Sequence, residues 1–361
     1  MSERAIDRRG FFRLGAAGAV LGLLNGSARA AEDGGLNLNA MIRPVPRSAK
    51  FIDEDWYIWG GSMARTEDGT CYLLYARWPR RLGHYAWLSH SEIAVATAQD
   101  PLGPYTFNSV ALPGKQGPNW VTSTTHNPTV LKAGGKYYLY FSSARVEGEI
   151  PESGPSPKAP YWEPTRRTQR IGVAYADHPV GPWTRVDEVL VPATPGTHDA
   201  FMTSNPSVTA CPDGTFLTVY KCLGADGKVF HGVAVADHPL GPFKKDPKPI
   251  LTHATSKFPA EDPYIWNQDG RFYAILKDMQ ANYTPEKRTL VLFESEDGHD
   301  WRPARHPLVT TRTIAWEDGQ RQDLFRLERP QLYLENGRPA VLFCAACESL
   351  EHSFNVHIPL V

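Results

Sequence analysis

The chain has 361 residues, of which 42% are hydrophobic and 11% aromatic, so it can bury a large core. Its 38 Lys and Arg residues nearly balance its 39 Asp and Glu residues, which gives a formal net charge of −1. This balance gives no electrostatic reason to expect binding to nucleic acid or to an anionic membrane. We therefore expect a partner that is neutral or small.

The first thirty residues are predicted to be an export signal. Arg8 and Arg9 precede an apolar stretch at residues 14–24, and Ala28-Arg29-Ala30 offers a small-residue cleavage site. This order is typical of a twin-arginine signal, and the apolar stretch is too short to span a bilayer comfortably. We expect residues 1–30 to be removed and the mature protein to be periplasmic or secreted, without a stable membrane anchor.

Further along, the chain repeats one β unit. A proline-centred phrase is followed each time by a turn and a second strand. The phrases are His126-Asn127-Pro128-Thr129-Val130, Ser204-Asn205-Pro206-Ser207-Val208, Glu261-Asp262-Pro263-Tyr264-Ile265 and Glu328-Arg329-Pro330-Gln331-Leu332. The turns, such as Asp213-Gly214 and Asn336-Gly337, are strong hairpin signals. An earlier fifth copy begins at Trp59-Gly60-Gly61-Ser62-Met63.

A second phrase alternates with the first, at residues 93–105, 171–183 and 231–243, with a diverged copy at 289–301. Two copies contain Asp-His-Pro before Gly-Pro-aromatic, and we interpret this repeated pattern as turn chemistry. Five copies of such a unit predict radially arranged sheets. The fold class is therefore all-β: a single-domain, five-bladed β-propeller at residues 51–361, after an N-terminal arm at 31–50.

The five cysteines are expected to be core residues. Their odd number and their places in or beside strands argue against a disulfide framework. Cys344 and Cys347 form a C-x-x-C, but no second pair lies nearby, so we interpret them as core positions of a final strand rather than metal ligands.

Propeller geometry indicates where a ligand would bind. The innermost strand of each blade lines a central channel, and the first residues of these strands converge at one mouth. The residues expected there are Trp59 to Ser62, His126, Asn127, Ser204, Asn205, Glu261, Asp262, Glu328 and Arg329. Aromatic faces stack on sugar rings, and Asn, Arg and carboxylate groups hydrogen-bond to hydroxyls, so this set favours an oligosaccharide or polysaccharide.

In blade layout, residues 50–361 resemble the five-bladed propeller glycoside hydrolases of families 43 and 117. The resemblance implies an inverting mechanism, with a carboxylate base on blade one, a pKa-modulating Asp on blade three and an acid on blade four. Glu261 stands at the acid position. Asn205 replaces the blade-three Asp, and Gly60-Gly61-Ser62 replaces the Asp-Pro of blade one.

We expect Glu261 to be the general acid, with its pKa raised by burial and by a neighbouring carboxylate. Asp55 or Glu328 would then be the base, and inversion requires about 6.5–9.5 Å between the two carboxyl groups. A salt bridge to a neighbouring blade is the alternative for each of these carboxylates. His126 could bind a sugar hydroxyl, act as an acid, hold a central ion or cap its own strand.

Arg170 and Arg329 could bind an anionic sugar, since a guanidinium matches carboxylate and sulfate oxygens; the alternative is pairing with nearby acids. The loops at residues 77–90 and 146–170 alternate aromatic and basic residues. We expect them to form a sugar-binding rim or an interface with another subunit.

These observations predict an exported, exo-acting glycoside hydrolase that requires no cofactor, although a structural divalent ion in the central channel is compatible with the sequence. The alternative is a propeller that binds glycans without cleaving them. A second carboxylate within inverting distance of Glu261 distinguishes the two.

Overall fold

The computed structural model describes residues 34–114, 124–146 and 156–361, so the predicted export signal lies outside the described residues. All the strands belong to one compact unit, Gly35–Val361. Within the described ranges, no helix is both long enough and apolar enough to span a bilayer.

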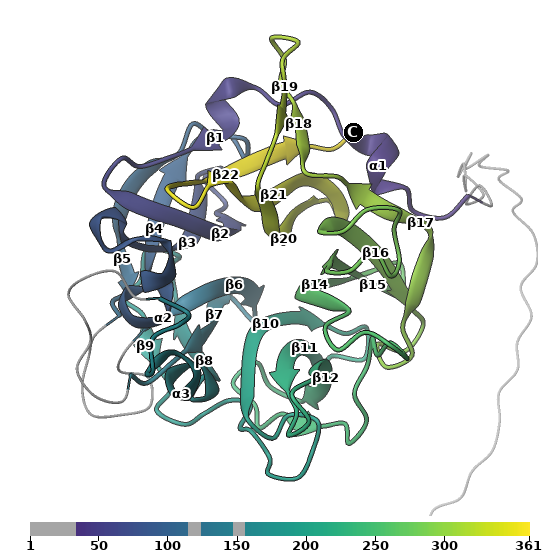
Figure 1. The fold of residues 1–361 in the computed structure, drawn as a ribbon. Helices are drawn as coiled ribbons and strands as arrows, with labels where there is room; N and C mark the ends of the chain where they lie inside the picture. Colours follow the sequence, from purple (N-terminus) through teal and green to yellow (C-terminus); the bar gives the residue numbers. More distant parts are fainter. Residues whose placement is uncertain (1–33, 115–123, 147–155) are drawn as a thin grey trace, which may run out of the picture. The chain divides into compact units, whose positions relative to one another are not determined.

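Five four-stranded antiparallel sheets surround a central axis (Figure 1) and confirm the predicted five-bladed β-propeller. Blade one contains β2 (Trp56–Arg65), β3 (Cys71–Pro79), β4 (Glu92–Ala98) and β5 (Thr106–Leu112). Blade two contains β6 (His126–Ala133), β7 (Lys136–Ser143), β8 (Arg170–Ala176) and β9 (Thr184–Arg185). Blade three contains β10 (Met202–Ala210), β11 (Phe216–Leu223), β12 (Val229–Ala236) and β13 (Lys244–Lys245). Blade four contains β14 (Ala260–Gln268), β15 (Arg271–Asp278), β16 (Thr289–Ser295) and β17 (Arg302–Thr310).

Blade five joins the two ends of the described chain. It contains β20 (Arg326–Glu335), β21 (Arg338–Ser349) and β22 (His352–Pro359), and its outermost strand is β1 (Lys50–Phe51) from the N-terminal side. Lys50 is paired with Val356, and Phe51 with Asn355. This pairing closes the ring of blades.

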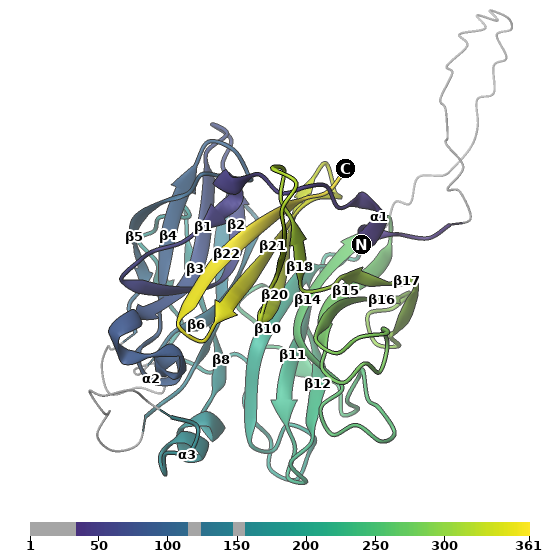
Figure 2. The ribbon, with the colours of Figure 1, turned by 45° about the horizontal axis from the view of Figure 1, so that its top comes forward.

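The remaining elements are short. They are α1 (Leu38–Met41), η1 (Arg47–Ala49), η2 (Arg80–Leu82), η3 (His84–Ala86), α2 (Trp87–His90), α3 (Trp162–Arg167) and the hairpin β18 (Thr313–Ala315) and β19 (Arg321–Asp323). Helices α2 and α3 lie together at the edge of blades one and two (Figure 2), where the Trp87 and Trp162 rings meet edge to face at 5.7 Å.

The inner strand of every blade contains a bulge at the same place. The residue there has a positive φ in all five blades: Gly60, Asn127, Asn205, Asp262 and Arg329. The pairing of each inner strand with its neighbour shifts register at this point. Bulges re-aim side chains, and a left-handed conformation costs free energy for most residues other than Gly, so five copies indicate a feature built into the fold.

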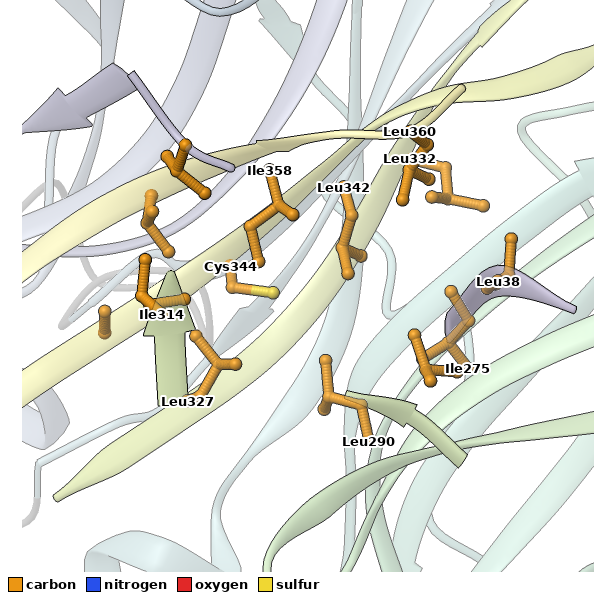
Figure 3. Packing of buried hydrophobic residues seen from close by; sticks show 14 of the residues in the cluster. Leu38, Ile275, Leu290, Ile314, Leu327, Leu332, Leu342, Cys344, Ile358 and Leu360 are labelled. Carbon is orange, nitrogen blue, oxygen red and sulfur yellow. The ribbon is translucent and has the colours of Figure 1, made fainter. Parts of the chain in front are cut away.

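Apolar side chains fill the spaces between neighbouring blades. Figure 3 shows one such cluster, in which Leu327, Leu342 and Cys344 of blade five pack with Ile275 and Leu290 of blade four. All five cysteines are free, and Cys344 and Cys347 are fully buried, as predicted for core positions.

The two Asp-His-Pro sequences are turns, as predicted. His178 Nδ1 accepts a hydrogen bond from Val180 N at 3.2 Å, and His238 Nδ1 accepts one from Leu240 N at 3.1 Å. Each imidazole also contacts a tyrosine of the neighbouring blade, Tyr72 or Tyr138.

Candidate functional site

A cavity of about 120 Å³ lies where the inner strands begin. It is lined by Trp59, Trp78, His84, Trp87, His126, Asn127, Gln169, Asn205, Lys221, Glu261, Asp262, Arg326 and Glu328. The convergence predicted for Glu261, Glu328, His126 and Asn205 at one end of the channel is therefore confirmed.

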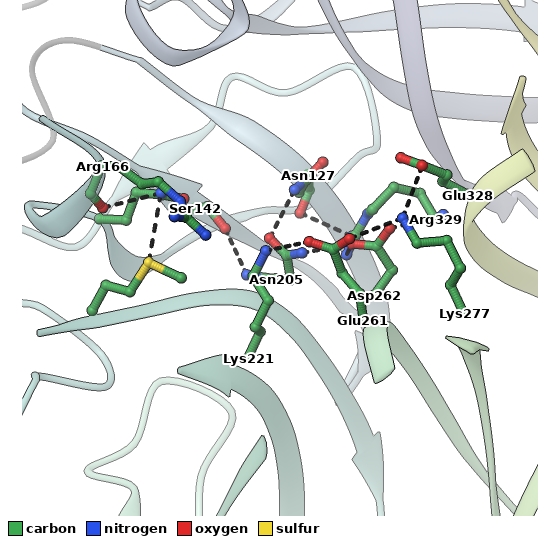
Figure 4. A network of polar contacts seen from close by, with 12 residues as sticks. Asn127, Ser142, Arg166, Asn205, Lys221, Glu261, Asp262, Lys277, Glu328 and Arg329 are labelled. Atoms are coloured by element: carbon green, nitrogen blue, oxygen red, sulfur yellow. Dashed lines mark hydrogen bonds and ion pairs between the residues drawn. The ribbon is translucent and has the colours of Figure 1, made fainter. Parts of the chain in front are cut away.

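One side of the cavity is an arc of alternating charges that crosses blades three, four and five (Figure 4). Lys221 Nζ lies 2.7 Å from Glu261 Oε1, and Lys277 Nζ lies 2.8 Å from Glu261 Oε2. The same Lys277 Nζ lies 2.8 Å from Glu328 Oε1, while Arg326 is 3.8 Å from Glu328 Oε2. Lys221, Glu261, Glu328 and Arg326 line the cavity, whereas Lys277 is buried behind the two glutamates that it joins. We call these five residues the charged half of the cavity.

The strand register explains this arc. Glu261 and Lys277 are directly paired between β14 and β15, and Lys221 occupies the corresponding position of β11, opposite Ser204. Because Lys277 binds both glutamates, their nearest oxygens cannot be further apart than twice 2.8 Å. The two carboxyl groups therefore lie on either side of one ammonium group, an arrangement compatible with the roughly 5–5.5 Å between the carboxyl groups of retaining enzymes.

The pKa values of the two neighbouring carboxyl groups, Glu261 and Asp262, differ from those predicted from the sequence. Burial opposes ionisation of Glu261, but the Lys221 and Lys277 ammonium groups outweigh it and hold the pKa of Glu261 well below its usual range. The raised pKa predicted for Glu261 is therefore wrong. The pKa of Asp262 is raised instead, by burial and by the nearby charge of Glu261.

Polar side chains at four of the five bulges form the floor beneath this arc. Asn127 Nδ2 donates to Asn205 Oδ1 at 2.8 Å, and Asn205 Nδ2 donates to Asp262 Oδ1 at 2.6 Å. Arg329 lies beside Asp262, with NH1 3.7 Å from Oδ1. Gly60 leaves room for this arginine, because a Cβ on Gly60 would lie 3.2 Å from Arg329 Cβ.

The opposite side of the cavity is aromatic and comes from blades one and two. Trp87 stacks on the His126 imidazole at 5.0 Å, and Trp78 meets that imidazole at 5.6 Å. His84 packs against Trp59 at 5.4 Å. We call Trp59, Trp78, His84, Trp87 and His126 the aromatic half of the cavity.

Both histidines of the aromatic half are neutral near pH 7. Burial and then the charge of Arg326 lower the pKa of His84 to about 4. Burial and then the charges of Arg329 and Lys221 hold the pKa of His126 well below its usual value. His126 Nδ1 is 2.8 Å from Ser91 Oγ, which fixes the orientation of the ring.

Several residues predicted for the site do not line the cavity. Asp55 lies in a separate surface depression with Arg80 and Arg81. Ser62 Oγ accepts a hydrogen bond from Val130 N of the next blade. Arg170 NH1 donates to the backbone oxygens of Arg167, Gln169 and Phe201, and Arg329 is buried at the level of the floor. Asp199, six residues before Asn205 in the sequence, pairs with Lys245 at 2.7 Å and does not line the cavity.

Two lining residues, Lys221 and Arg326, were not predicted from the sequence, and Gln169 belongs to the loop at residues 146–170 that was expected to form part of a rim. Lys221 could have been found by aligning the second strands of the blades, because it occupies the place of Lys277. Trp78, His84 and Trp87 belong to the loop expected at residues 77–90 to form a sugar-binding rim, and they form a wall of the cavity.

The site offers little to a divalent cation. The described part of the chain contains no group of three or more His, Cys, Asp or Glu side chains arranged to hold a metal. At the floor, the Arg329 guanidinium would repel a cation placed between the bulges. A divalent ion in the central channel thus remains a prediction without support from these residues.

Comparison with known proteins identifies the fold. A family 117 glycoside hydrolase from the marine bacterium Zobellia galactanivorans is 20% identical, with 85% of this chain and 86% of that chain covered and a TM-score of 0.58. A thermostable family 43 glycoside hydrolase is 13% identical, with 88% and 91% covered and a TM-score of 0.60. An endo-arabinase from Bacteroides thetaiotaomicron is 12% identical, with 88% and 97% covered and a TM-score of 0.54.

No family model matches the chain, and a search of curated proteins found no match. The structural likenesses confirm the expected resemblance to propeller glycoside hydrolases at the level of the fold.

Proposed function

We propose that this protein is a glycoside hydrolase that releases one terminal sugar unit from a glycan. The structures that share its fold include glycoside hydrolases of families 43 and 117. The cavity volume of about 120 Å³ is roughly eight to twelve times what one water needs, which suits a single sugar ring better than a stretch of polymer. Aromatic side chains on one side and charged groups on the other suit the two kinds of surface on a sugar.

The observation on which the mechanism rests is that Glu261 and Glu328 share the ammonium group of Lys277. Because the two carboxyl groups are bridged by one ammonium group, they are close enough for retention of configuration, and we propose retention in place of the inversion expected from the resemblance. Glu261, kept ionised by two lysines, would be the nucleophile, and Glu328 would transfer the proton.

The reaction then has two steps. The Glu261 carboxylate attacks the anomeric carbon while Glu328 gives its proton to the departing glycosidic oxygen, which forms a glycosyl ester on Glu261. Water then attacks the same carbon, Glu328 takes a proton from it, and the Glu261 carboxylate is released.

Lys277 connects the two roles by its position. Its Nζ lies 2.8 Å from Glu261 Oε2 and 2.8 Å from Glu328 Oε1, so one buried ammonium group holds both carboxyl groups on the same side of the cavity. The proposed nucleophile and the proposed proton donor are therefore positioned by the same side chain.

The test is hydrolysis of a panel of plant and algal oligosaccharides and of nitrophenyl glycosides by the wild type and Glu261→Gln. We expect a loss of roughly two to four orders of magnitude on both kinds of substrate, because a nucleophile is needed whatever the leaving group. Glu294→Gln is the matched control, since Glu294 also pairs with two cations, Arg271 and Arg302, but lies outside the cavity.

The anomer first released, followed by NMR, should keep the configuration of the substrate. An inverted product, or a Glu261→Gln variant that spares nitrophenyl substrates, would assign Glu261 to the acid role instead. Activity unchanged in Glu261→Gln would exclude it from the chemistry.

One observation favours a second candidate, a propeller that binds glycans without cleaving them. Both oxygens of Glu261 are already in ion pairs, and Gly60 occupies the blade-one position where the resemblance implies a base. Saturable binding of an oligosaccharide with no sugar released over many hours would support this alternative.

We also propose export by the twin-arginine route to the periplasm or the medium, supported by the order of Arg8, Arg9, the apolar stretch and the cleavage site in the sequence. Changing Arg8 and Arg9 to Lys should leave the protein in the cytoplasmic fraction. Unchanged export of that variant would contradict the proposal.

A further inference from the structure

The charged half of the cavity begins and ends with a cation. Along the arc the order is Lys221, Glu261, Lys277, Glu328 and Arg326. Each of the three interior members has a partner of opposite charge on either side, whereas Lys221 and Arg326 have one carboxylate neighbour each. The arc therefore has one more positive than negative group.

The two cations at the ends of the arc, Lys221 and Arg326, have N–H groups without a hydrogen-bond acceptor in the described part of the chain. The Lys221 ammonium has three N–H groups, and within the described residues its only hydrogen-bond acceptor is Glu261 Oε1, although the residue is only 8% exposed. Arg326 is 3.8 Å from Glu328 Oε2, which is too long for a hydrogen bond, and its Nε has no acceptor in the described part of the chain. A buried donor without an acceptor is costly, and a ligand oxygen would remove that cost.

The surroundings do not cancel the positive excess. His84 and His126 are neutral near pH 7, so the aromatic half adds no charge. At the floor, Arg329 lies 3.7 Å from Asp262, so this pair adds one positive and one carboxyl group and does not reverse the excess. In a cavity lined by mostly buried side chains, such an excess attracts anions more strongly than it would on the open surface.

We propose that the sugar bound in this cavity is anionic, and that Lys221 and Arg326 receive its carboxylate or sulfate ester. This inference rests on the proposed function for the identity of the ligand as a sugar, and it adds the charge of that sugar. It moves the expected anion site from Arg170 and Arg329 to the two ends of the charged arc.

The test compares sugars that differ only in charge: glucuronides and galacturonides, their methyl esters, the corresponding neutral glycosides, and sulfated glycosides. We expect kcat/KM for the matching acid to exceed that for its methyl ester at least about tenfold, and the preference to shrink as NaCl is raised, because salt screens charge pairs. The uronate and sulfate arms distinguish the two anionic groups.

Lys221→Met and Arg326→Met should each reduce the acid-to-ester ratio severalfold. Lys228→Met, at an exposed lysine of the same blade paired with Asp226, is the matched control and should leave the ratio unchanged. A neutral sugar or an ester cleaved as well as its acid, or a ratio that survives both substitutions, would overturn the inference while leaving hydrolysis intact.

If no glycoside in the panel is cleaved, the proposed hydrolysis fails, and calorimetric binding of free glucuronate, galacturonate, sulfated sugars and neutral sugars then decides the question of charge. Binding of an anionic sugar at least tenfold tighter than its neutral counterpart, weakened in Lys221→Met, would support the anion site. Equal binding of charged and neutral sugars, or no binding, would overturn it.

Discussion

The two halves of the cavity are built on opposite physical principles. The aromatic half consists of rings packed at 5.0–6.3 Å, with His84 and His126 kept neutral among tryptophans. The charged half consists of ion pairs at 2.7–2.8 Å, closed at one end by the longer contact between Arg326 and Glu328. Packing is tolerant of small displacements, whereas buried ion pairs depend on partner and distance.

This difference assigns different tasks to the two halves. In the proposed function, the aromatic half holds the apolar face of a sugar ring in several chemical variants, because stacking is sensitive to shape and area. The charged half then sets protonation states and selects the charge of the sugar. Substitutions in it should therefore change chemistry, and substitutions in the aromatic half should change affinity and acid stability.

The largest effect is expected from Lys277→Met. Removing one partner of a buried ion pair costs about 3–5 kcal/mol, and here two carboxylates lose their shared cation. We expect a loss of that size in the free energy of unfolding, measured with urea, and a loss of activity of about a hundredfold or more in the fraction that remains folded.

Lys245→Met is the control for this variant, because it breaks another lysine–carboxylate pair, with buried Asp199, outside the cavity. It should lower stability without lowering the activity of the folded protein. Equal activity of the two variants would show that Lys277 has only a structural role.

The second-largest effect concerns the pH dependence of the free energy of unfolding, which should differ between residues of the aromatic half and the charged half. His84 has a pKa of about 4 when folded and about 6.5 when unfolded, so the unfolded chain binds the proton more readily. Stability should therefore fall as pH drops from 6.5 towards 4, by on the order of 3 kcal/mol from this residue. Glu261 behaves differently: its stabilisation is lost only as the pH falls below about 4.5, the ordinary value, towards its lowered folded pKa.

Urea unfolding of the wild type and His84→Gln at pH 7.0 and 5.0 measures this contribution. The variant should lose less stability on acidification than the wild type. His126, His231 and His357, which are also buried with lowered pKa values, titrate in both proteins, so the difference reports on His84 together with its effect on the neighbouring His126. An identical pH dependence in both would contradict the assignment.

The smallest effect is expected from Trp87→Leu in the aromatic half. An aromatic contact contributes about 0.5–1.5 kcal/mol beyond the area that it buries, so KM should rise about threefold to tenfold while kcat changes little. Trp301→Leu, on the outer side of blade four, is the control and should leave KM unchanged. A large fall in kcat for Trp87→Leu would place this ring in the chemical step.

The sequence was sufficient for the fold because its information is local and repeated. Each proline-centred phrase, such as Ser204 to Val208, is followed by a turn and a strand, so five copies specify five blades without knowledge of distant contacts. The same alignment placed Glu261, Glu328 and His126 at one mouth, because equivalent positions of inner strands converge.

The chemistry was harder to predict because it depends on pairs formed across strands and blades. The pKa of Glu261 was assigned from burial and its neighbour Asp262, while Lys221 and Lys277 on the second strands reverse its direction. Asp55 is near Trp59 in sequence, yet it belongs to a different depression. Closeness in sequence to an inner strand does not show whether a side chain faces the central axis of the propeller or its outer surface.

The pairing of β1 with β22 has a consequence for the order of folding. The residues that complete blade five, Lys50 and Phe51, pair with Val356 and Asn355. A contact between such distant parts of the sequence is slow to form, because a long loop must close before it is made. During synthesis, the first four blades can form before β22 has emerged, but β1 has no partner strand until then. The pairing that closes the ring is therefore the last one to form.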